Sequence, residues 1–193
     1  MKEFRFVILG AGNIAGKFCE AVSLIEGAAV VAVASKSLTK AMNFAEKNGV
    51  VKAYGDYEEM LQMEKPDGAY IAVTPNDHHR LSMLCLKYGV PVLCEKAMFR
   101  NSREAREVFS LSERKEIFVM EALWSRFLPA VREAEEWLAT GRIGKAKLAH
   151  CTIGFRADQD PEKRYYSPKL GGGASKDITV YAYEITTYLI RQK

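Results

Sequence analysis

The glycine-rich segment Gly10–Ala15 has the spacing G-x-G-x-x-A, which is suited to holding a pyrophosphate. Gly10 permits a tight turn after an apolar run, and Gly12 lets the backbone approach an anion. Asn13 and Ile14 would then open a helix whose first N–H groups and dipole face the phosphates. A plain strand-to-helix turn is the alternative interpretation. Because an apolar run precedes the segment and a helical pattern follows it, we predict a dinucleotide-binding loop.

The end of the second predicted strand bears on which dinucleotide fits. NAD sites usually place a carboxylate there to accept from the ribose hydroxyls, but no carboxylate occurs between Glu26 and Glu46. Ser35 and Lys36 stand at this position instead. A lysine and a hydroxyl suit a 2′-phosphate, so the segment favours NADP over NAD. The alternative is that Lys36 is a solvated loop residue.

A candidate reaction centre lies beyond other strand ends, where open parallel sheets bind their ligands. The segments Thr74-Pro75-Asn76 and Glu95-Lys96 each follow an apolar run. Lys96, held beside a nicotinamide, would donate a proton to a carbonyl or polarise it; an ordinary surface Glu–Lys pair is the alternative. Asp177 and Tyr181 lie four residues apart on a predicted helix and would face the same way.

The predicted elements that must position these residues alternate strictly between strand and helix. Strands are expected at about 4–9, 29–34, 50–54, 68–73, 91–94 and 117–120, with helices at about 14–25, 38–47, 58–62, 79–88 and 102–115. This alternation predicts an α/β fold with a doubly wound parallel Rossmann sheet over residues 1–122. The pattern then changes to a helix at 127–140, a strand at 145–155 and a helix at 174–192. Residues 123–193 are therefore expected to begin a second, α+β domain.

Composition narrows the classes of partner. The chain has 193 residues and a formal net charge of +4, with both signs interspersed, which argues against nucleic-acid binding. Its four cysteines lie far apart without metal-ligand spacing, which indicates a reducing compartment and no metal site. The N-terminus lacks the pattern of a signal peptide, and no apolar run is long enough to span a bilayer. We expect a cytoplasmic protein with a small-molecule substrate.

Several of these motifs together resemble the glucose–fructose oxidoreductase, inositol dehydrogenase and rhizopine-catabolism family, abbreviated Gfo/Idh/MocA. The resemblance rests on Gly10–Ala15, Thr74-Pro75-Asn76 with His79, Cys94-Glu95-Lys96, and Leu170–Ala174 followed by Asp177 and Tyr181. The stretch Met120–Pro129 is similar to the branch that contains dimeric dihydrodiol dehydrogenase and NADP-dependent xylose dehydrogenase. The resemblance runs over essentially the whole chain.

The resemblance implies hydride transfer between NADP or NAD and a carbinol carbon of a sugar, polyol or dihydrodiol. Lys96 would be the main acid–base group, assisted by Asp177 and Tyr181. The cofactor would be bound by Gly10, Gly12, Asn13, Ile14, Ser35, Lys36, Thr74, Pro75, Asn76, His79, Glu95 and Lys96, and the substrate by Trp124, Arg126 and Phe155. Packing between domains is the alternative for Trp124, and the start of a helix is the alternative for His79. His78 and His150 receive no role.

The sequence departs from the family pattern at Ala97, where proline usually follows the Glu-Lys pair. Family members also continue into an open antiparallel sheet that commonly forms dimer interfaces, and residues 145–155 would supply only its first strand. We expect the full-length form to be a homo-oligomer. A non-catalytic NAD(P)-binding sensor or regulator on the same fold, or a cofactor-binding fragment that is inactive by itself, is a second interpretation. A third, an enzyme like biliverdin reductase, would not require the segment Trp124–Arg126.

Overall fold

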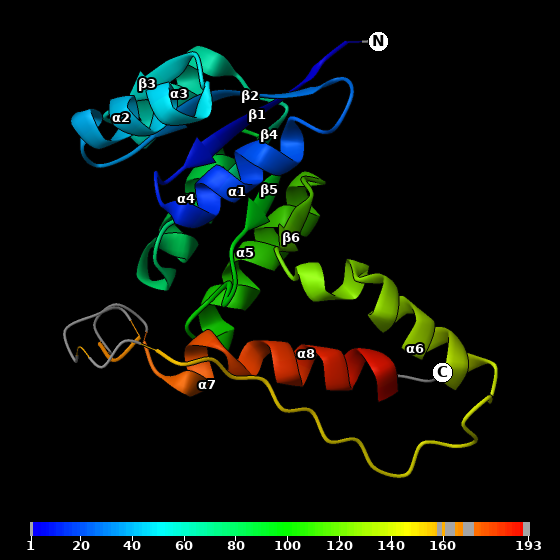
Figure 1. The fold of residues 1–193 in the computed structure, drawn as a ribbon. Helices are drawn as coiled ribbons and strands as arrows, with labels where there is room; N and C mark the ends of the chain where they lie inside the picture. Colours follow the sequence, from blue (N-terminus) through cyan, green and yellow to red (C-terminus); the bar gives the residue numbers. More distant parts are fainter. Residues whose placement is uncertain (1, 158–159, 161–164, 168–171, 191–193) are drawn as a thin grey trace. The chain divides into compact units, whose positions relative to one another are not determined.

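The computed structural model of the chain describes residues 2–157, 160, 165–167 and 172–190 (Figure 1). The chain forms two compact units, Met1–Glu121 and Ala122–Lys193. Each unit is a separate cluster of contacts and is described by itself.

The first unit is a six-stranded sheet with helices on both faces. Its elements are β1 (Phe4–Leu9), α1 (Asn13–Val22), β2 (Ala28–Ala34), α2 (Leu38–Asn48), β3 (Lys52–Tyr54), α3 (Tyr57–Glu64), β4 (Gly68–Ile71), α4 (Pro75–Lys87), β5 (Val92–Cys94), α5 (Ser102–Lys115) and β6 (Val119–Glu121). All strands are parallel and their order is β3-β2-β1-β4-β5-β6. This is the doubly wound Rossmann order, so the predicted fold class is confirmed.

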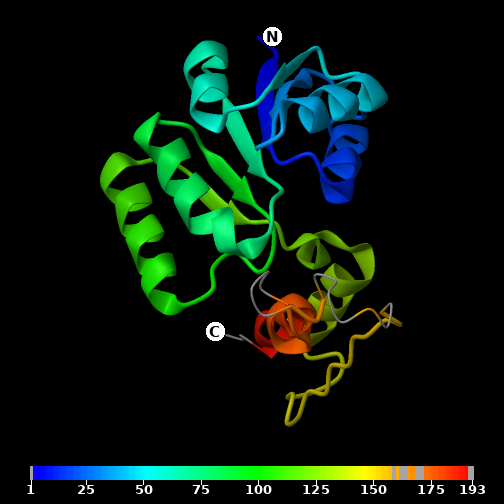
Figure 2. The same ribbon diagram turned by 90° about the vertical axis from the view of Figure 1, so that its left-hand side faces the viewer.

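Alternate residues of the central strands bury opposite faces of the sheet. Val7, Leu9 and Ile71 share one hydrophobic core with residues of α3 and α4. On the other face, Tyr70 of β4 stacks on Phe18 of α1 with ring centroids 4.1 Å apart. Figure 2 shows α4 and α5, in green, on one side of the sheet and α1, in blue, on the other. Burial on both faces explains why the central strands are apolar without interruption.

The helix after β4 begins earlier than the sequence predicted. Thr74 has an extended backbone and Pro75 occupies the first turn of α4, where its fixed φ and missing N–H cost nothing. The expected start at residue 79 was therefore wrong by one helical turn. This shift decides which of the two neighbouring histidines faces the interior.

The second unit contains η1 (Trp124–Phe127), α6 (Pro129–Ala139), α7 (Ala174–Asp177) and α8 (Thr179–Ile190). The strand expected at 145–155 was wrong, because these residues form no strand in the structure. A strand needs a neighbour to satisfy its backbone N–H and C=O groups. The described part of this unit contains no strand that could pair with it.

The single helix expected over 174–192 was also wrong, since α7 ends and α8 begins on either side of Ile178. Ile178 has a φ of −116°, well away from the helical value. The Thr179 hydroxyl donates to the Ala174 carbonyl at 3.1 Å, and this carbonyl also accepts from the Ile178 N–H at 3.0 Å. Residues 191 and 192, and Leu170 and Gly171 of the family motif, lie outside the described residues.

Candidate functional site

The two glycines of the loop between β1 and α1 have different surroundings. Gly10 has no space for a side chain, whereas Gly12 has open space beside it. Gly10 has a φ of +117°, and a Cβ there would lie 2.5 Å from the Ala72 carbonyl oxygen. A Cβ on Gly12 would meet only that oxygen, at 4.0 Å. No side chain caps the N-terminus of α1, so its first N–H groups suit an external anion. Asn13 and Ile14 form the start of this helix.

The end of β2 contributes one buried hydroxyl and one lysine. Ser35 is buried, its N–H donates to the Tyr54 carbonyl at 3.1 Å, and its hydroxyl accepts from the Ser37 N–H at 3.5 Å. Lys36 Nζ donates to Asp77 Oδ2 at 2.6 Å. Asp77 belongs to the first turn of α4 and was not predicted as part of the site. The binding roles of Ser35 and Lys36 stay predictions.

Lys96 follows the carboxyl end of β5 on a segment fixed by Glu95. The Glu95 N–H donates to the Ile71 carbonyl at 2.9 Å, which extends the pairing with β4. Its carboxylate accepts from the Tyr70 hydroxyl at 2.5 Å and from the Lys96 N–H at 3.2 Å. Lys96 itself is half-buried, and the Lys96–Ala97 peptide is cis. Glu95 therefore holds the backbone that carries the predicted acid–base group.

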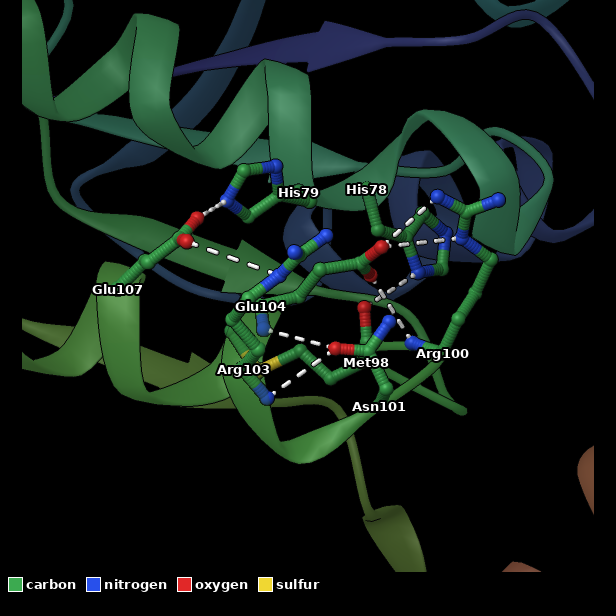
Figure 3. Close-up of polar contacts among 8 residues, drawn as sticks. All are labelled: His78, His79, Met98, Arg100, Asn101, Arg103, Glu104 and Glu107. Carbon is green, nitrogen blue, oxygen red and sulfur yellow. Dashed lines mark hydrogen bonds and ion pairs between the residues drawn. The ribbon is translucent and has the colours of Figure 1, made fainter.

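His78, which was assigned no role from the sequence, supports the segment that follows Lys96. It is completely buried, with Nδ1 3.1 Å from the carbonyl oxygens of Ala97 and Met98 and Nε2 3.1 Å from that of Val73. Figure 3 shows its contact with Met98. Burial lowers the pKa of His78, although the three carbonyls and the charge of Glu95 oppose this effect. The imidazole is therefore neutral near pH 7, and one ring nitrogen donates.

The contacts of His78 join two segments at the carboxyl edge of the sheet. Val73 lies just after β4, and Ala97 and Met98 come directly after Lys96. Glu121 at the end of β6 adds a further support, since its carboxylate accepts from the Met98 N–H at 2.8 Å. The signal that could have identified His78 was helical spacing from Pro75. Such spacing places it with the buried residues Leu81, Ser82 and Cys85.

His79 points away from this arrangement. Its Nε2 lies 2.9 Å from a Glu107 carboxylate oxygen of α5, as Figure 3 shows, and its ring meets Phe99 edge-on at 6.4 Å. His79 thus links α4 to α5. Thr74 and Asn76, also predicted for the cofactor, are hydrogen-bonded to each other at 2.5 Å. The cofactor roles of His79, Thr74, Pro75 and Asn76 stay predictions.

In the second unit the structure brings two predicted residues together. The indole Nε1 of Trp124 donates to the hydroxyl of Tyr181 at 2.9 Å, and the two rings meet edge to face. Tyr181 is buried, whereas Trp124 is 58% exposed. Asp177 lies on α7 and Tyr181 on α8, so they are not on one continuous helix as expected.

The other two predicted substrate residues have partners within the second unit. Arg126 pairs with the buried Glu184 and stacks over the ring of Tyr188 at 5.1 Å. Phe155 meets Tyr165 edge to face, with centroids 5.3 Å apart. The contacts of Arg126 are those of a residue that fixes η1 against α8, and its substrate role stays a prediction.

The described residues contain neither a metal-binding group of side chains nor a membrane-spanning helix. No group of three or more His, Cys, Asp or Glu side chains in that part of the chain is arranged to hold a metal ion. None of the helices described is long and apolar enough to cross a membrane.

Comparison with known proteins identifies the family. Residues 4–123 match the model of the Gfo/Idh/MocA oxidoreductase family with an NAD-binding Rossmann fold, and residues 131–193 match the Gfo/Idh/MocA C-terminal domain. The chain belongs to the Gfo/Idh/MocA family. It is 36% identical over 187 residues to a trans-1,2-dihydrobenzene-1,2-diol dehydrogenase of Mus musculus, covering 96% of this chain and 56% of the relative. The corresponding Homo sapiens protein is 35% identical over 185 residues, covering 95% and 55%.

Solved structures share the fold of this chain. An NAD-binding oxidoreductase from Klebsiella pneumoniae superposes with a TM-score of 0.84 at 24% identity, covering 97% of this chain and 53% of that one. A 3-ketoreductase from Actinomadura kijaniata, solved with TDP-benzene and NADP, gives a TM-score of 0.68 at 23% identity, covering 75% and 44%. This chain thus spans about half the length of the curated relatives it matches.

Proposed function

We propose that this chain binds NADP in preference to NAD and serves hydride transfer between the nicotinamide and a CH–OH carbon of a sugar, polyol or dihydrodiol. The observation that carries the proposal is the convergence of two loops at the carboxyl edge of one sheet. One is the glycine loop after β1, and the other is the braced segment that bears Lys96 after β5.

The residues at this edge fit a dinucleotide. Gly12 leaves space beside the uncapped N-terminus of α1, where a pyrophosphate would accept hydrogen bonds from backbone N–H groups. Lys36 follows β2, the strand paired with β1, and would place its ammonium beside the adenosine ribose. A lysine there favours a 2′-phosphate through a charge-assisted hydrogen bond.

A bound nicotinamide supplies or accepts the hydride. Lys96 would give a proton to the substrate oxygen when a carbonyl is reduced and take it back when an alcohol is oxidised. Because His78, Glu95 and Glu121 fix the backbone on both sides of Lys96, its ammonium can be held in one position without reorganisation. In the second unit, the Tyr181 hydroxyl accepts a hydrogen bond from the Trp124 indole at 2.9 Å.

The relatives support the reaction class. Proteins named trans-1,2-dihydrobenzene-1,2-diol dehydrogenase match almost the whole of this chain. The titles of solved neighbours contain both cofactors, NAD+ in an oxidoreductase from Agrobacterium radiobacter and NADP in the 3-ketoreductase. The preference for NADP therefore rests on Ser35 and Lys36 rather than on the family.

Calorimetric titration with each dinucleotide tests the cofactor preference. Lys36→Asp should weaken NADP binding and spare NAD binding. A charge-assisted hydrogen bond contributes about 1.5–3 kcal/mol, so the NADP affinity should fall by roughly tenfold or more. Lys40→Asp, one turn into α2, is the matched control for the charge change. Unchanged NADP binding in Lys36→Asp would remove the basis for the preference.

Turnover of a panel of sugars, polyols and trans-dihydrodiols tests the chemistry. In a full-length form, Lys96→Met should lower turnover by roughly 10²–10⁴-fold, the usual contribution of a general acid–base group, while NADP affinity changes little. Lys87→Met is the control, because Lys87 pairs with Glu58 on the protein surface. Turnover that survives Lys96→Met within a few fold would eliminate Lys96 as the proton donor. NADP binding by a full-length form without turnover of any compound would support a non-catalytic binding protein instead.

A further inference from the structure

Three charged side chains meet between the ends of β2 and β4. The Asp77 carboxylate accepts from Lys36 Nζ at 2.6 Å through one oxygen, and from the Arg80 guanidinium at 3.3 Å through the other. Lys36 and Arg80 are mostly exposed, whereas the side chain of Asp77 is only 16% exposed. One largely buried carboxylate therefore stands between two accessible cations.

The ion pair between Lys36 and Asp77 crosses the place where the adenosine half of a dinucleotide is bound in this fold. Lys36 follows β2, Asp77 opens the helix after β4, and β1 lies between these two strands in the sheet. The pair therefore spans the carboxyl end of β1, where the glycine loop begins. In Rossmann domains the groups at the end of the second strand contact the 2′ position of the adenosine ribose.

Arg80 is held in this cluster from a second direction. Its guanidinium carbon lies 5.9 Å from the ring centroid of Tyr57, which is buried at the start of α3. An arginine over an aromatic ring keeps its N–H fork available for a second, anionic partner. The guanidinium of Arg80 can donate two parallel hydrogen bonds to a phosphate. This residue was not identified from the sequence.

We propose that Asp77 sets the balance between NADP and NAD by occupying Lys36 and Arg80, and that Arg80 is a second ligand of the 2′-phosphate. The proposal rests on the proposed function, since it assumes that a dinucleotide binds at this edge. When the ribose carries a free 2′-hydroxyl, both cations stay with Asp77 and their charge is partly neutralised. When it carries a phosphate, Lys36 and Arg80 turn toward that group, and Asp77 repels it.

The net charge of these three side chains determines whether a substitution raises or lowers the affinity for NADP. With Asp77 the three side chains carry one net positive charge, and with asparagine they would carry two. One unit of charge a few ångströms from a phosphate in partly solvated surroundings changes affinity by about tenfold. Asp77→Asn should therefore raise NADP affinity about tenfold and change NAD affinity by less than about threefold.

Calorimetric titrations with NADP and NAD on the whole chain test the proposal, with the adenosine fragments 2′,5′-ADP and 5′-AMP as probes of the same subsite. Asp67→Asn is the matched control, because Asp67 also accepts from a lysine, at 3.3 Å, but lies before β4 at the opposite edge of the sheet. It removes the same charge and should leave both affinities unchanged. Arg80→Met should lower the affinity for NADP and 2′,5′-ADP about tenfold and spare NAD and 5′-AMP.

The outcomes separate this proposal from the proposed function. If the wild-type chain binds neither dinucleotide, the proposed function fails. If it binds both and the ratio of the two affinities is the same in Asp77→Asn as in wild type, the role of Asp77 is refuted while cofactor binding stands. Because Arg80 is exposed, Arg80→Met tests the second ligand even if Asp77→Asn does not fold. Equal loss of NADP and NAD binding in Arg80→Met would refute the role of Arg80.

Discussion

Replacing His78 by alanine should destabilise the first unit far more than the same change at its neighbour His79. His78 is completely buried and contacts the carbonyl oxygens of Val73, Ala97 and Met98. Its removal loses about 1 kcal/mol for a hydrogen bond and about 2 kcal/mol for the cavity that a truncated buried side chain leaves. We expect a loss of about 3 kcal/mol in the free energy of unfolding.

The matched variant His79→Ala removes a half-buried ring whose ion pair with Glu107 lies near the surface. Partly exposed ion pairs contribute about 0–1 kcal/mol, so this change should be small. At about 2–4 °C per kcal/mol for a chain of this size, His78→Ala should lower the melting temperature by about 6–12 °C. Urea and thermal denaturation followed by circular dichroism measure both effects. Equal destabilisation by the two variants would show that His78 does not brace the Lys96 segment.

The pH dependence of stability provides a second check on His78. Burial lowers the pKa of the folded-state imidazole, so the unfolded chain binds a proton first as the pH falls. The stability that neutral His78 provides is therefore complete above its ordinary pKa of about 6.5 and decreases below that value. The wild type should therefore lose free energy of unfolding between pH 7 and pH 5 through His78, and His78→Gln should not show this contribution. A pH profile identical to that of the wild type would contradict the assignment of a neutral buried imidazole.

Two further pairs of variants test the first unit, one pair at each edge of its sheet. Glu64 is buried at the amino edge of the sheet among Arg5, Lys52 and Tyr54. Glu64→Gln should therefore lower the free energy of unfolding, measured by urea denaturation, by about 3 kcal/mol, and Glu58→Gln on the surface should lower it much less. Equal urea midpoints for the two variants would refute this role of Glu64. Gly10→Ala should prevent folding because its Cβ would lie 2.5 Å from a carbonyl oxygen, whereas Gly12→Ala should fold and lose dinucleotide affinity. A Gly12→Ala protein that binds NADP like the wild type would show that the phosphates lie elsewhere.

The sheet was predictable from the sequence because buried parallel strands are encoded by local apolar runs. Each central strand was found within a few residues of its expected position, including Phe4–Leu9 and Gly68–Ile71. The prediction of a strand at 145–155 was wrong because a strand needs a neighbouring strand to pair with, and the local sequence pattern does not reveal whether one is present. The single helix expected over 174–192 was wrong for a different reason, since the interruption lies in the backbone of one residue, Ile178, whose φ is −116°.

The positions of the loops that form the candidate site could be predicted from the sequence. The contacts among their side chains could not. Gly12 and Lys96 follow strands that the sequence identified, so their place at the carboxyl edge followed from topology. The roles of neighbouring residues depended on details of one helix. A start at Pro75 instead of residue 79 turned His78 inward and His79 toward α5. The pairing of Lys36 with Asp77 joins residues 41 positions apart, and no local pattern indicated it.

The central claim is that the carboxyl edge of the first unit binds a dinucleotide across the glycine loop and the Lys96 segment. Titration of the isotopically labelled chain with NADPH, followed through backbone amide NMR shifts, tests it most directly. We expect saturable shifts concentrated at Gly10–Ala15, Ser35–Ser37, Thr74–Asp77 and Glu95–Met98, with Asp67 at the opposite edge unaffected. No saturable shift, or shifts that cluster away from these four segments, would contradict it.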